Sequence, residues 1–373
     1  MLATSTVVLV CFALVLAGGL LEAALTALAR AALPVRIHVN GTRGKSSVTR
    51  LIAAALREAG VPVVAKVTGT EPRLILPDGS ERPVRRFGPA TIREQIRLLW
   101  TARRLGARAV VAECMAVRPD LQWISERRIL RSTLGVVTNV RPDHGEEMGT
   151  TLDSVARSLA NTVPERAILV IGEERHCHVF RERAEKLKTR LVVAPPSGSW
   201  REANEALALA VARELGVPDS VARAGMAKAV SDPGAVWSGT LELPCGNIPC
   251  LDATAANDPE SFDTLVDEWM NDLERLSSRP RTVTVVFNHR GDRPERLRAF
   301  VRHSRALRAA TRGLVTGERP AVYLSHSLRA AWQHEYVRPG ALGVRLAGLL
   351  SSGDAVAFAG NTRGFSLESV RFS

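Results

Sequence analysis

The sequence predicts an α/β protein in which two domains with mostly parallel sheets follow one N-terminal apolar helix. Three observations support this class. An uncharged apolar run occupies residues 4–21, short β-branched runs alternate with longer stretches of helical spacing, and a glycine-rich loop joins the first such run to the helix after it. The length of 373 residues suits two domains better than one.

The N-terminal run, TSTVVLVCFALVLAGGLL, is just long enough to span a bilayer as a helix. Arg30 and Arg36 are the first basic residues and follow the run, so the positive-inside rule places the C-terminal side in the cytoplasm. A cleaved signal peptide is the alternative, but no basic segment precedes the apolar run. We therefore expect a single-pass anchor in the cytoplasmic membrane, with the rest of the chain in the cytoplasm.

The net charge narrows the class of partner. A formal charge of +12 favours acidic partners, such as nucleotides, anionic polymers, anionic lipids or nucleic acid. Proteins that read nucleic acid usually gather aromatic residues with their basic ones, whereas here aromatic residues make up only 5% and the arginines are dispersed. We therefore expect no nucleic-acid partner.

A phosphate-binding loop is predicted where NGTRGKSS joins a short strand, Val35–Val39, to a helix whose apolar spacing starts at Val48. Glycines let backbone N–H groups close around phosphate oxygens, and the start of the helix adds the positive end of its dipole. Lys45 is expected to reach the β- and γ-phosphates of ATP, and Ser46 to hold Mg²⁺. The ordinary loop has a glycine where this chain has Val39, so the loop is of a shortened type. Its expected nucleotide-binding residues are Gly41, Thr42, Arg43, Gly44, Lys45, Ser46 and Ser47.

A carboxylate follows the next buried strand. ARAVVA, residues 107–112, is apolar and β-branched, and Glu113 comes directly after it. Parallel sheets bind ligands beyond the carboxyl ends of their strands, so Glu113 is expected to face the phosphate-bound Mg²⁺ beside Ser46.

The shortened loop G-T-x-G-K-[ST] resembles the ATP loop of the Mur ligase family, which includes folylpolyglutamate synthases. TNVRPDHGEEMG, after the predicted strand Leu134–Val137, resembles the family's strand end whose histidine contributes to a Mg²⁺ site. The resemblance implies that His144, beside Asp143, joins Ser46 and Glu113 as a metal ligand. A structural histidine is the alternative.

The resemblance continues beyond the first strands. Asn204, in REANEALALA, is similar to an asparagine that lies near the nucleotide in the family, although an asparagine that only caps the helix is the alternative. In the second half, LDATAANDPES resembles a substrate-binding loop and implies roles for Asp252 and Asn257. NHRGDRPER, after the predicted strand Thr282–Phe287, resembles a nucleotide-binding loop that implies roles for Arg290 and Asp292.

A narrower resemblance follows from the order of several motifs. NGTRGKSSVTRLI, KVTGTEPR, ECMAVRPD, TNVRPDHGEEMGTTLD, DPGA and AANDPES resemble the ligase subunits of poly-γ-glutamate synthases from about Pro34 onward. This resemblance implies an ATP-dependent amide ligase (ADP-forming) that activates a terminal carboxylate as an acyl phosphate, for attack by the amine of glutamate. It also implies a poly-γ-glutamate chain as substrate, small membrane subunits and an extracytoplasmic subunit as partners, and catalytic roles for Lys45, Glu113 and His144.

The segment KVTGTEPR supplies candidate contacts to the acceptor carboxylate. We expect Lys66 and Arg73 to be loop cations there, with Thr68 and Thr70 beside them; solvated surface charges are the alternative. One family feature is missing, because GTTLDSVARSLANTV, residues 149–163, has no lysine that could be carbamylated.

The predicted domains are an anchor with a juxtamembrane helix at residues 1–30, an ATP-binding P-loop domain at 31–236 and a smaller Rossmann-like domain at 237–373. Two alternatives to poly-γ-glutamate synthesis remain. One is a ligase of the same fold that acts on another acid, and the other is a membrane-tethered P-loop ATPase that drives or regulates polymer export without forming a bond.

Overall fold

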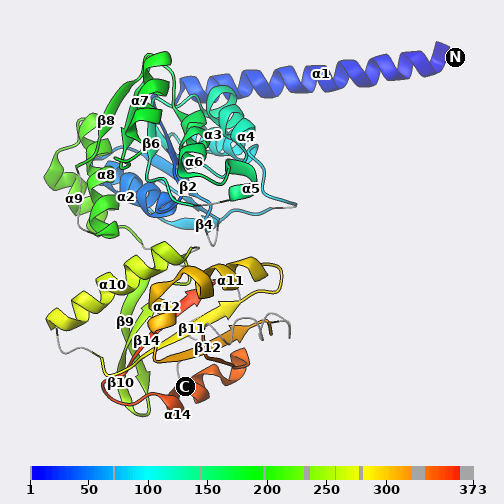
Figure 1. The fold of residues 1–373 in the computed structure, drawn as a ribbon. Coiled ribbons are helices and arrows are strands. Elements are labelled where there is room, and N and C mark those ends of the chain that lie inside the picture. Colours follow the sequence, from blue (N-terminus) through cyan, green and yellow to red (C-terminus); the bar gives the residue numbers. More distant parts are fainter. Residues whose placement is uncertain are drawn as a thin grey trace. The chain divides into compact units, whose positions relative to one another are not determined.

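The computed structural model describes residues 2–69, 72–86, 88–142, 144–195, 199–230, 236–256, 258–276, 280–320 and 332–361. The chain divides into two compact units, Met1–Asp232 and Pro233–Ser373. Each unit has its own mostly parallel sheet (Figure 1), so the expected α/β class is confirmed.

The first unit contains an eight-stranded sheet of order β4-β3-β2-β5-β1-β6-β7-β8. Only the edge pairs β2–β3 and β3–β4 are antiparallel; the other neighbours are parallel. The central strands β5 and β6 are buried along their whole length, which explains their nearly continuous apolar sequences. The strands are β1 (Val35–Asn40), β2 (Val63–Val67), β3 (Arg73–Ile75), β4 (Glu81–Pro83), β5 (Ala109–Glu113), β6 (Leu134–Val137), β7 (Ile168–Ile171) and β8 (Arg190–Val193).

Helices cover both faces of this sheet (Figure 1). Side chains of α2, α8 and α9 form one apolar core with the sheet, while α3 and η1, and α6 and α7, contribute to two cores on the other face. The helices are α1 (Leu2–Ala31), α2 (Lys45–Glu58), α3 (Glu94–Arg104), α4 (Pro119–Ile124), the π-helix η1 (Ser125–Leu130), α5 (Gly145–Met148), α6 (Leu152–Leu159), the 3₁₀-helix η2 (Ala160–Thr162), α7 (Cys177–Lys186), α8 (Trp200–Glu214) and α9 (Asp219–Ala227).

Helix α1 continues past the predicted apolar run without a break. Its stretch Thr6–Ala31 is long and apolar enough to cross a membrane, and its large apolar side chains between Val7 and Leu21 are more than half exposed. Only its C-terminal part docks on the unit. There Glu22 pairs with Arg93, and Arg30 donates hydrogen bonds to two carbonyl oxygens of η1 at 2.9 and 3.0 Å.

The second unit contains a six-stranded sheet of order β13-β12-β11-β14-β10-β9, in which only β9–β10 is antiparallel. Helices α10, α11 and α12 pack on one face and α14 on the other. The elements are β9 (Trp237–Leu243), β10 (Gly246–Asp252), α10 (Pro259–Leu276), β11 (Val283–His289), α11 (Pro294–His303), α12 (Arg305–Ala309), β12 (Arg312–Gly317), β13 (His334–Tyr336), η3 (Pro339–Ala341), α14 (Leu342–Leu349) and β14 (Ala355–Gly360).

Candidate nucleotide and metal site

The glycine-rich loop lies between β1 and α2, as the sequence predicts, and α2 begins directly at Lys45. Two of its glycines have positive φ, 128° at Gly41 and 78° at Gly44. A Cβ atom on Gly41 would lie 2.0 Å from Thr138 Oγ1, and one on Gly44 would lie 2.6 Å from Asn204 Oδ1. Both positions therefore require glycine for backbone conformation and for close approach.

Lys45 lies over the glycine-rich loop, where it could contact a phosphate, and Ser46 lies beside Glu113, where the two could hold a metal ion. The Lys45 ammonium donates hydrogen bonds to the carbonyl oxygens of Gly41 at 2.7 Å and Thr42 at 3.3 Å, so it stays over the loop. Ser46 Oγ donates a hydrogen bond to Glu113 Oε2 at 2.8 Å, and the backbone N–H of Thr68 donates to the same oxygen at 2.7 Å. The structure thus brings Ser46, Glu113 and Thr68 together at one edge of the sheet.

The Ser46–Glu113 pair fits Mg²⁺. A hydroxyl and a carboxylate are hard oxygen ligands, and Mg²⁺ on a nucleotide usually takes only one or two protein oxygens beside phosphates and waters. Within the described ranges, no three His, Cys, Asp or Glu side chains form a cluster that could hold an ion. A metal at this edge would therefore depend on oxygens from the nucleotide and water.

Asn139, for which the sequence alone predicts no role, fixes the conformation of the glycine-rich loop. Its Oδ1 accepts hydrogen bonds from Thr42 Oγ1 at 2.8 Å and from the Arg43 N–H at 3.1 Å. Its Nδ2 donates to the Arg43 carbonyl at 3.1 Å, where Thr138 Oγ1 also donates at 2.6 Å. The sequence feature that could indicate this role is the position of Asn139 just after β6, because β6 pairs with β1, the strand that leads into the glycine-rich loop.

Asn204 lies against the glycine-rich loop and does not cap its helix. Ser199 is the N-cap of α8 and forms a capping box with Glu202, so the capping alternative for Asn204 is wrong. Asn204 is buried one turn into the helix, and its carboxamide faces Gly44.

His144 lies on the loop after β6, just before α5, and is exposed. It adopts a left-handed backbone conformation, with φ of 40°, and its carbonyl accepts hydrogen bonds from the first turn of α5. Such strain in a non-glycine residue is often found at functional sites. Metal binding by His144 remains a prediction, and Asp143 and Thr70 lie outside the described residues.

The expectation that Lys66 and Arg73 are loop cations is wrong. Lys66 lies in β2 and Arg73 in β3, so both belong to the sheet. Lys66 is only 3% exposed and pairs with Glu94 at 2.8 Å, and Glu94 also pairs with Arg86 at 2.7 Å. Burial lowers the pKa of Lys66, an effect that Glu94 opposes. Lys66 and Arg86 together neutralise the buried Glu94 carboxylate, which would be costly to bury unpaired.

The predicted residues of the second unit lie at strand ends. Asp252 ends β10, where its Oδ1 accepts hydrogen bonds from the Thr254 N–H and hydroxyl at 3.0 and 2.7 Å. Burial raises the pKa of Asp252, and these two hydrogen bonds oppose the rise. Arg290 and Asp292 follow β11 and form a bidentate ion pair with distances of 3.0 and 2.6 Å. Asn257 lies outside the described residues.

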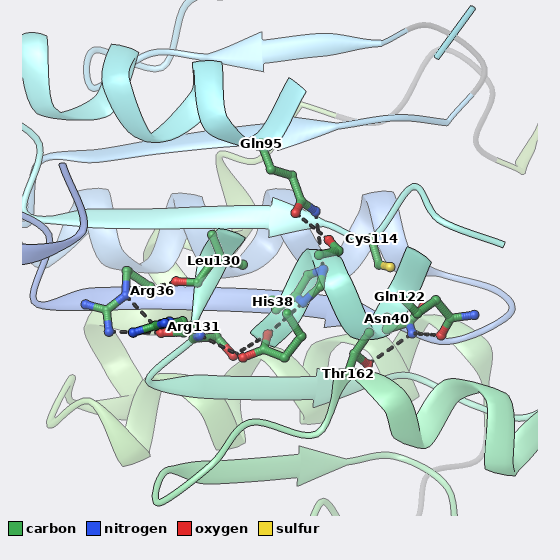
Figure 2. A network of polar contacts seen from close by, with 12 residues as sticks. Arg36, His38, Asn40, Gln95, Cys114, Gln122, Leu130, Arg131 and Thr162 are labelled. Carbon is green, nitrogen blue, oxygen red and sulfur yellow. Dashed lines mark hydrogen bonds and ion pairs between the residues drawn. The ribbon is translucent and has the colours of Figure 1, made fainter. Parts of the chain in front are cut away.

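A buried polar network surrounds β1, the strand that leads into the glycine-rich loop (Figure 2). His38, two residues before the end of β1, pairs through Nδ1 with Glu126 of η1 at 2.9 Å. Glu126 also accepts hydrogen bonds from the Ser132 N–H and hydroxyl at 2.8 and 2.9 Å. Asn40, the last residue of β1, donates to Gln122 and to Thr162, each at 3.0 Å. These contacts fix the strand from which the glycine-rich loop departs.

Gly44→Ala is expected to lower ATP affinity at least about tenfold, because a side chain at positive φ costs roughly 1–3 kcal/mol and here also meets Asn204. Gly60→Ala is the matched control, since Gly60 has φ of 76° but no atom within 4 Å of an added Cβ. Titration with a fluorescent ATP analogue measures both. Equal affinity in the two variants would show that the contact between Gly44 and Asn204 has no part in binding.

Two protein-family descriptions match the chain, one in each unit. The Mur ligase middle domain matches residues 39–205, and the poly-gamma-glutamate synthase CapB C-terminal domain matches residues 245–364. The chain is 36% identical to PGA synthase CapB of Bacillus subtilis (strain 168) over 283 residues, which cover 72% of this chain and 71% of that protein. The chain belongs to the CapB family.

Further relatives agree with this membership. The capsule biosynthesis protein CapB of Bacillus anthracis is 38% identical over 285 residues, or 72% of this CapB-family chain and 60% of that protein. The fold is also that of a bifunctional folylpolyglutamate synthase/dihydrofolate synthase from Yersinia pestis, whose structure was solved with AMPPNP and a Mn ion. The TM-score is 0.64 with 18% identity, over 94% of this chain and 90% of that one.

Proposed function

We propose that this protein is an ATP-dependent ligase that extends poly-γ-glutamate and forms ADP. The observation that carries the proposal is the Ser46–Glu113 pair, set at the end of a glycine-rich loop in a chain of the CapB family. The nucleotide and manganese in the Yersinia pestis relative support ATP with a divalent cation, which we propose to be Mg²⁺.

ATP makes the reaction favourable by activating a carboxylate that has no good leaving group. An oxygen of the acceptor's terminal carboxylate attacks the γ-phosphorus, ADP leaves, and an acyl phosphate forms. The amine nitrogen of glutamate then attacks the acyl carbon, inorganic phosphate leaves, and the nitrogen loses a proton to give the amide. Lys45 is expected to hold the γ-phosphate, while Ser46 and Glu113 hold Mg²⁺, which neutralises phosphate charge when bound.

The other predicted residues complete the proposal. We propose His144 as a second metal contact, Asn204, Arg290 and Asp292 as nucleotide contacts, and Asp252 with Asn257 as substrate contacts. We also propose that residues 1–30 form an anchor, residues 31–236 an ATP-binding domain and residues 237–373 a Rossmann-like domain. Small membrane subunits and an extracytoplasmic subunit are the proposed partners.

The membrane anchor gives a separate prediction. Deleting residues 2–21 is expected to move the protein from the membrane fraction to the soluble fraction, because most of the exposed large apolar side chains of α1 lie between Val7 and Leu21. ATP binding is expected to persist, since Glu22 and Arg30 remain to dock the rest of the helix. Membrane fractionation with immunoblotting measures the change. A truncated chain that still sediments with membranes would contradict the anchor.

Phosphate release by the purified full chain in detergent tests the proposed function. Mg·ATP is supplied with glutamate and a γ-glutamyl oligomer, with other amino acids, or alone. Release that requires glutamate and disappears in Lys45→Ala is expected. Release that is indifferent to every acid would contradict the ligase and favour an ATPase.

A further inference from the structure

A cavity of about 530 Å³ lies between α3 and the β3–β4 edge of the first sheet. Its volume falls within the range of 300–1,000 Å³ that is typical of ligand sites. It is lined by the basic side chains of Lys66, Arg82, Arg85 and Arg97, by the Glu94 carboxylate, and by apolar side chains that include Leu74 and Leu98.

The positive charge in this cavity is only partly neutralised. Lys66 and Glu94 pair with each other, and Arg86 adds a second cation to Glu94. The three arginines Arg82, Arg85 and Arg97 are exposed, and their guanidinium groups form no salt bridge with any carboxylate of the described residues. The cavity therefore has a surplus of guanidinium groups, which favour carboxylates or phosphates as ligands.

The inner end of the cavity lies next to the catalytic edge of the sheet. Lys66 is aligned with Ala112 in the β2–β5 pair, and Ala112 directly precedes Glu113. Lys66 and Glu113 are also close enough to interact electrostatically. The Lys66 ammonium also donates a hydrogen bond to Met115 Sδ at 3.5 Å, two residues after Glu113. The inner end of the cavity therefore lies near the carboxyl end of the sheet, on the face opposite to the Glu113 side chain.

The same helix that lines the cavity contacts the anchor. Arg93, directly before α3, pairs with Glu22 of α1, and apolar side chains of α3 share a core with Ala29. Glu22 comes directly after Leu21, the last of the large apolar side chains of α1 that are at least 60% exposed. The inner end of the cavity, at the Lys66–Glu94 pair, and the anchor contact, at the Arg93–Glu22 pair, therefore lie at the same N-terminal end of α3.

We propose that this cavity binds the γ-glutamyl chain behind its reacting end and leads the growing polymer toward the anchor. This inference rests on the proposed function. A γ-linked chain presents one free carboxylate per unit, which suits Arg82, Arg85 and Arg97, and methylene groups, which suit the apolar lining. A polymer is favoured over an anionic lipid because the cavity's inner end, at Lys66, lies near the carboxyl end of the sheet, the edge at which Ser46 and Glu113 meet.

The test compares two triple variants of the full chain in an uncharged detergent. Arg82→Gln/Arg85→Gln/Arg97→Gln removes the cavity charges, and Arg103→Gln/Arg104→Gln/Arg108→Gln removes the same charge from exposed positions nearby. Fluorescence anisotropy measures the Kd for fluorescein-labelled poly-γ-glutamate, and flotation measures binding to phosphatidylglycerol vesicles. The single variant Arg97→Gln provides a second measurement in case the triple variant does not fold. The affinity for ATP shows whether each variant is folded.

The cavity variant is expected to bind the polymer about tenfold more weakly than the control variant, with unchanged ATP affinity, and Arg97→Gln is expected to fall between them. Equal polymer affinity in the two triple variants would overturn the proposal. Loss of vesicle binding with intact polymer binding would instead assign the cavity to anionic lipid. Glutamate-dependent phosphate release by the unaltered chain is measured separately, so failure of the proposed function is distinguished from failure of the cavity.

Discussion

Glu113→Gln is expected to lower the rate of glutamate-dependent phosphate release by about 100-fold or more. The substitution keeps the side-chain shape and leaves an oxygen that can accept from Ser46 and from the Thr68 N–H. It removes the negative charge that would attract Mg²⁺, so a higher Mg²⁺ concentration is expected to restore part of the rate. Steady-state kinetics over a series of Mg²⁺ concentrations measures both effects.

Glu182→Gln is the control for this experiment. Glu182 is an exposed carboxylate on α7 that forms an ion pair with Lys186 and lies outside the proposed site. Its loss is expected to leave the rate unchanged. If Glu113→Gln had the same rate and the same Mg²⁺ dependence as Glu182→Gln, Glu113 would have no role in catalysis or in Mg²⁺ binding.

His38→Asn is expected to destabilise the first unit by about 3–5 kcal/mol, because it leaves the buried Glu126 carboxylate without its cation. Hydrogen exchange of the peptide that contains residues 35–40 measures the free energy of opening of β1. His303→Asn is the control, since His303 is exposed on α11 in the other unit.

The His38–Glu126 pair also predicts the pH dependence of this stability. Burial lowers the pKa of His38, but the contacts with Cys114 and Glu126 outweigh it and raise the pKa to about 10. The unfolded value is about 6.5, so the contribution is complete below that pH and is lost as the pH rises toward 10. His38→Asn is expected to flatten the decline in this window. A decline of the same slope in the variant would show that His38 is not charged in the folded chain.

The strands and the loop could be predicted from the sequence because local signals determine them. β-Branched runs are typical of buried parallel strands, and Gly41 and Gly44 occupy backbone conformations that favour glycine. The predicted strand Leu134–Val137 agrees with β6 in both bounds. Ser46 and Glu113 could be paired because the carboxyl ends of parallel strands meet at one edge.

Contacts between distant residues could not be predicted in the same way. The expectation from KVTGTEPR is that Lys66 is a loop cation, whereas the pairing of β2 with β3 and β5 puts it inside the sheet. Glu94, which pairs with Lys66, and Glu126, which pairs with His38, both lie on helices. The positions of these helices depend on packing between distant parts of the chain. Asn139 was missed because an asparagine after a strand has many structural uses.

The most direct test of the account follows covalent growth of the polymer. The full chain in detergent is incubated with Mg·ATP, isotopically labelled glutamate and an unlabelled γ-glutamyl oligomer, and the products are resolved by mass spectrometry. We expect labelled units to join the oligomer by amide bonds, with one ADP and one phosphate formed per unit, and we expect Lys45→Ala to form no labelled oligomer. ATP consumption without labelled oligomer, or formation of AMP and pyrophosphate, would contradict it.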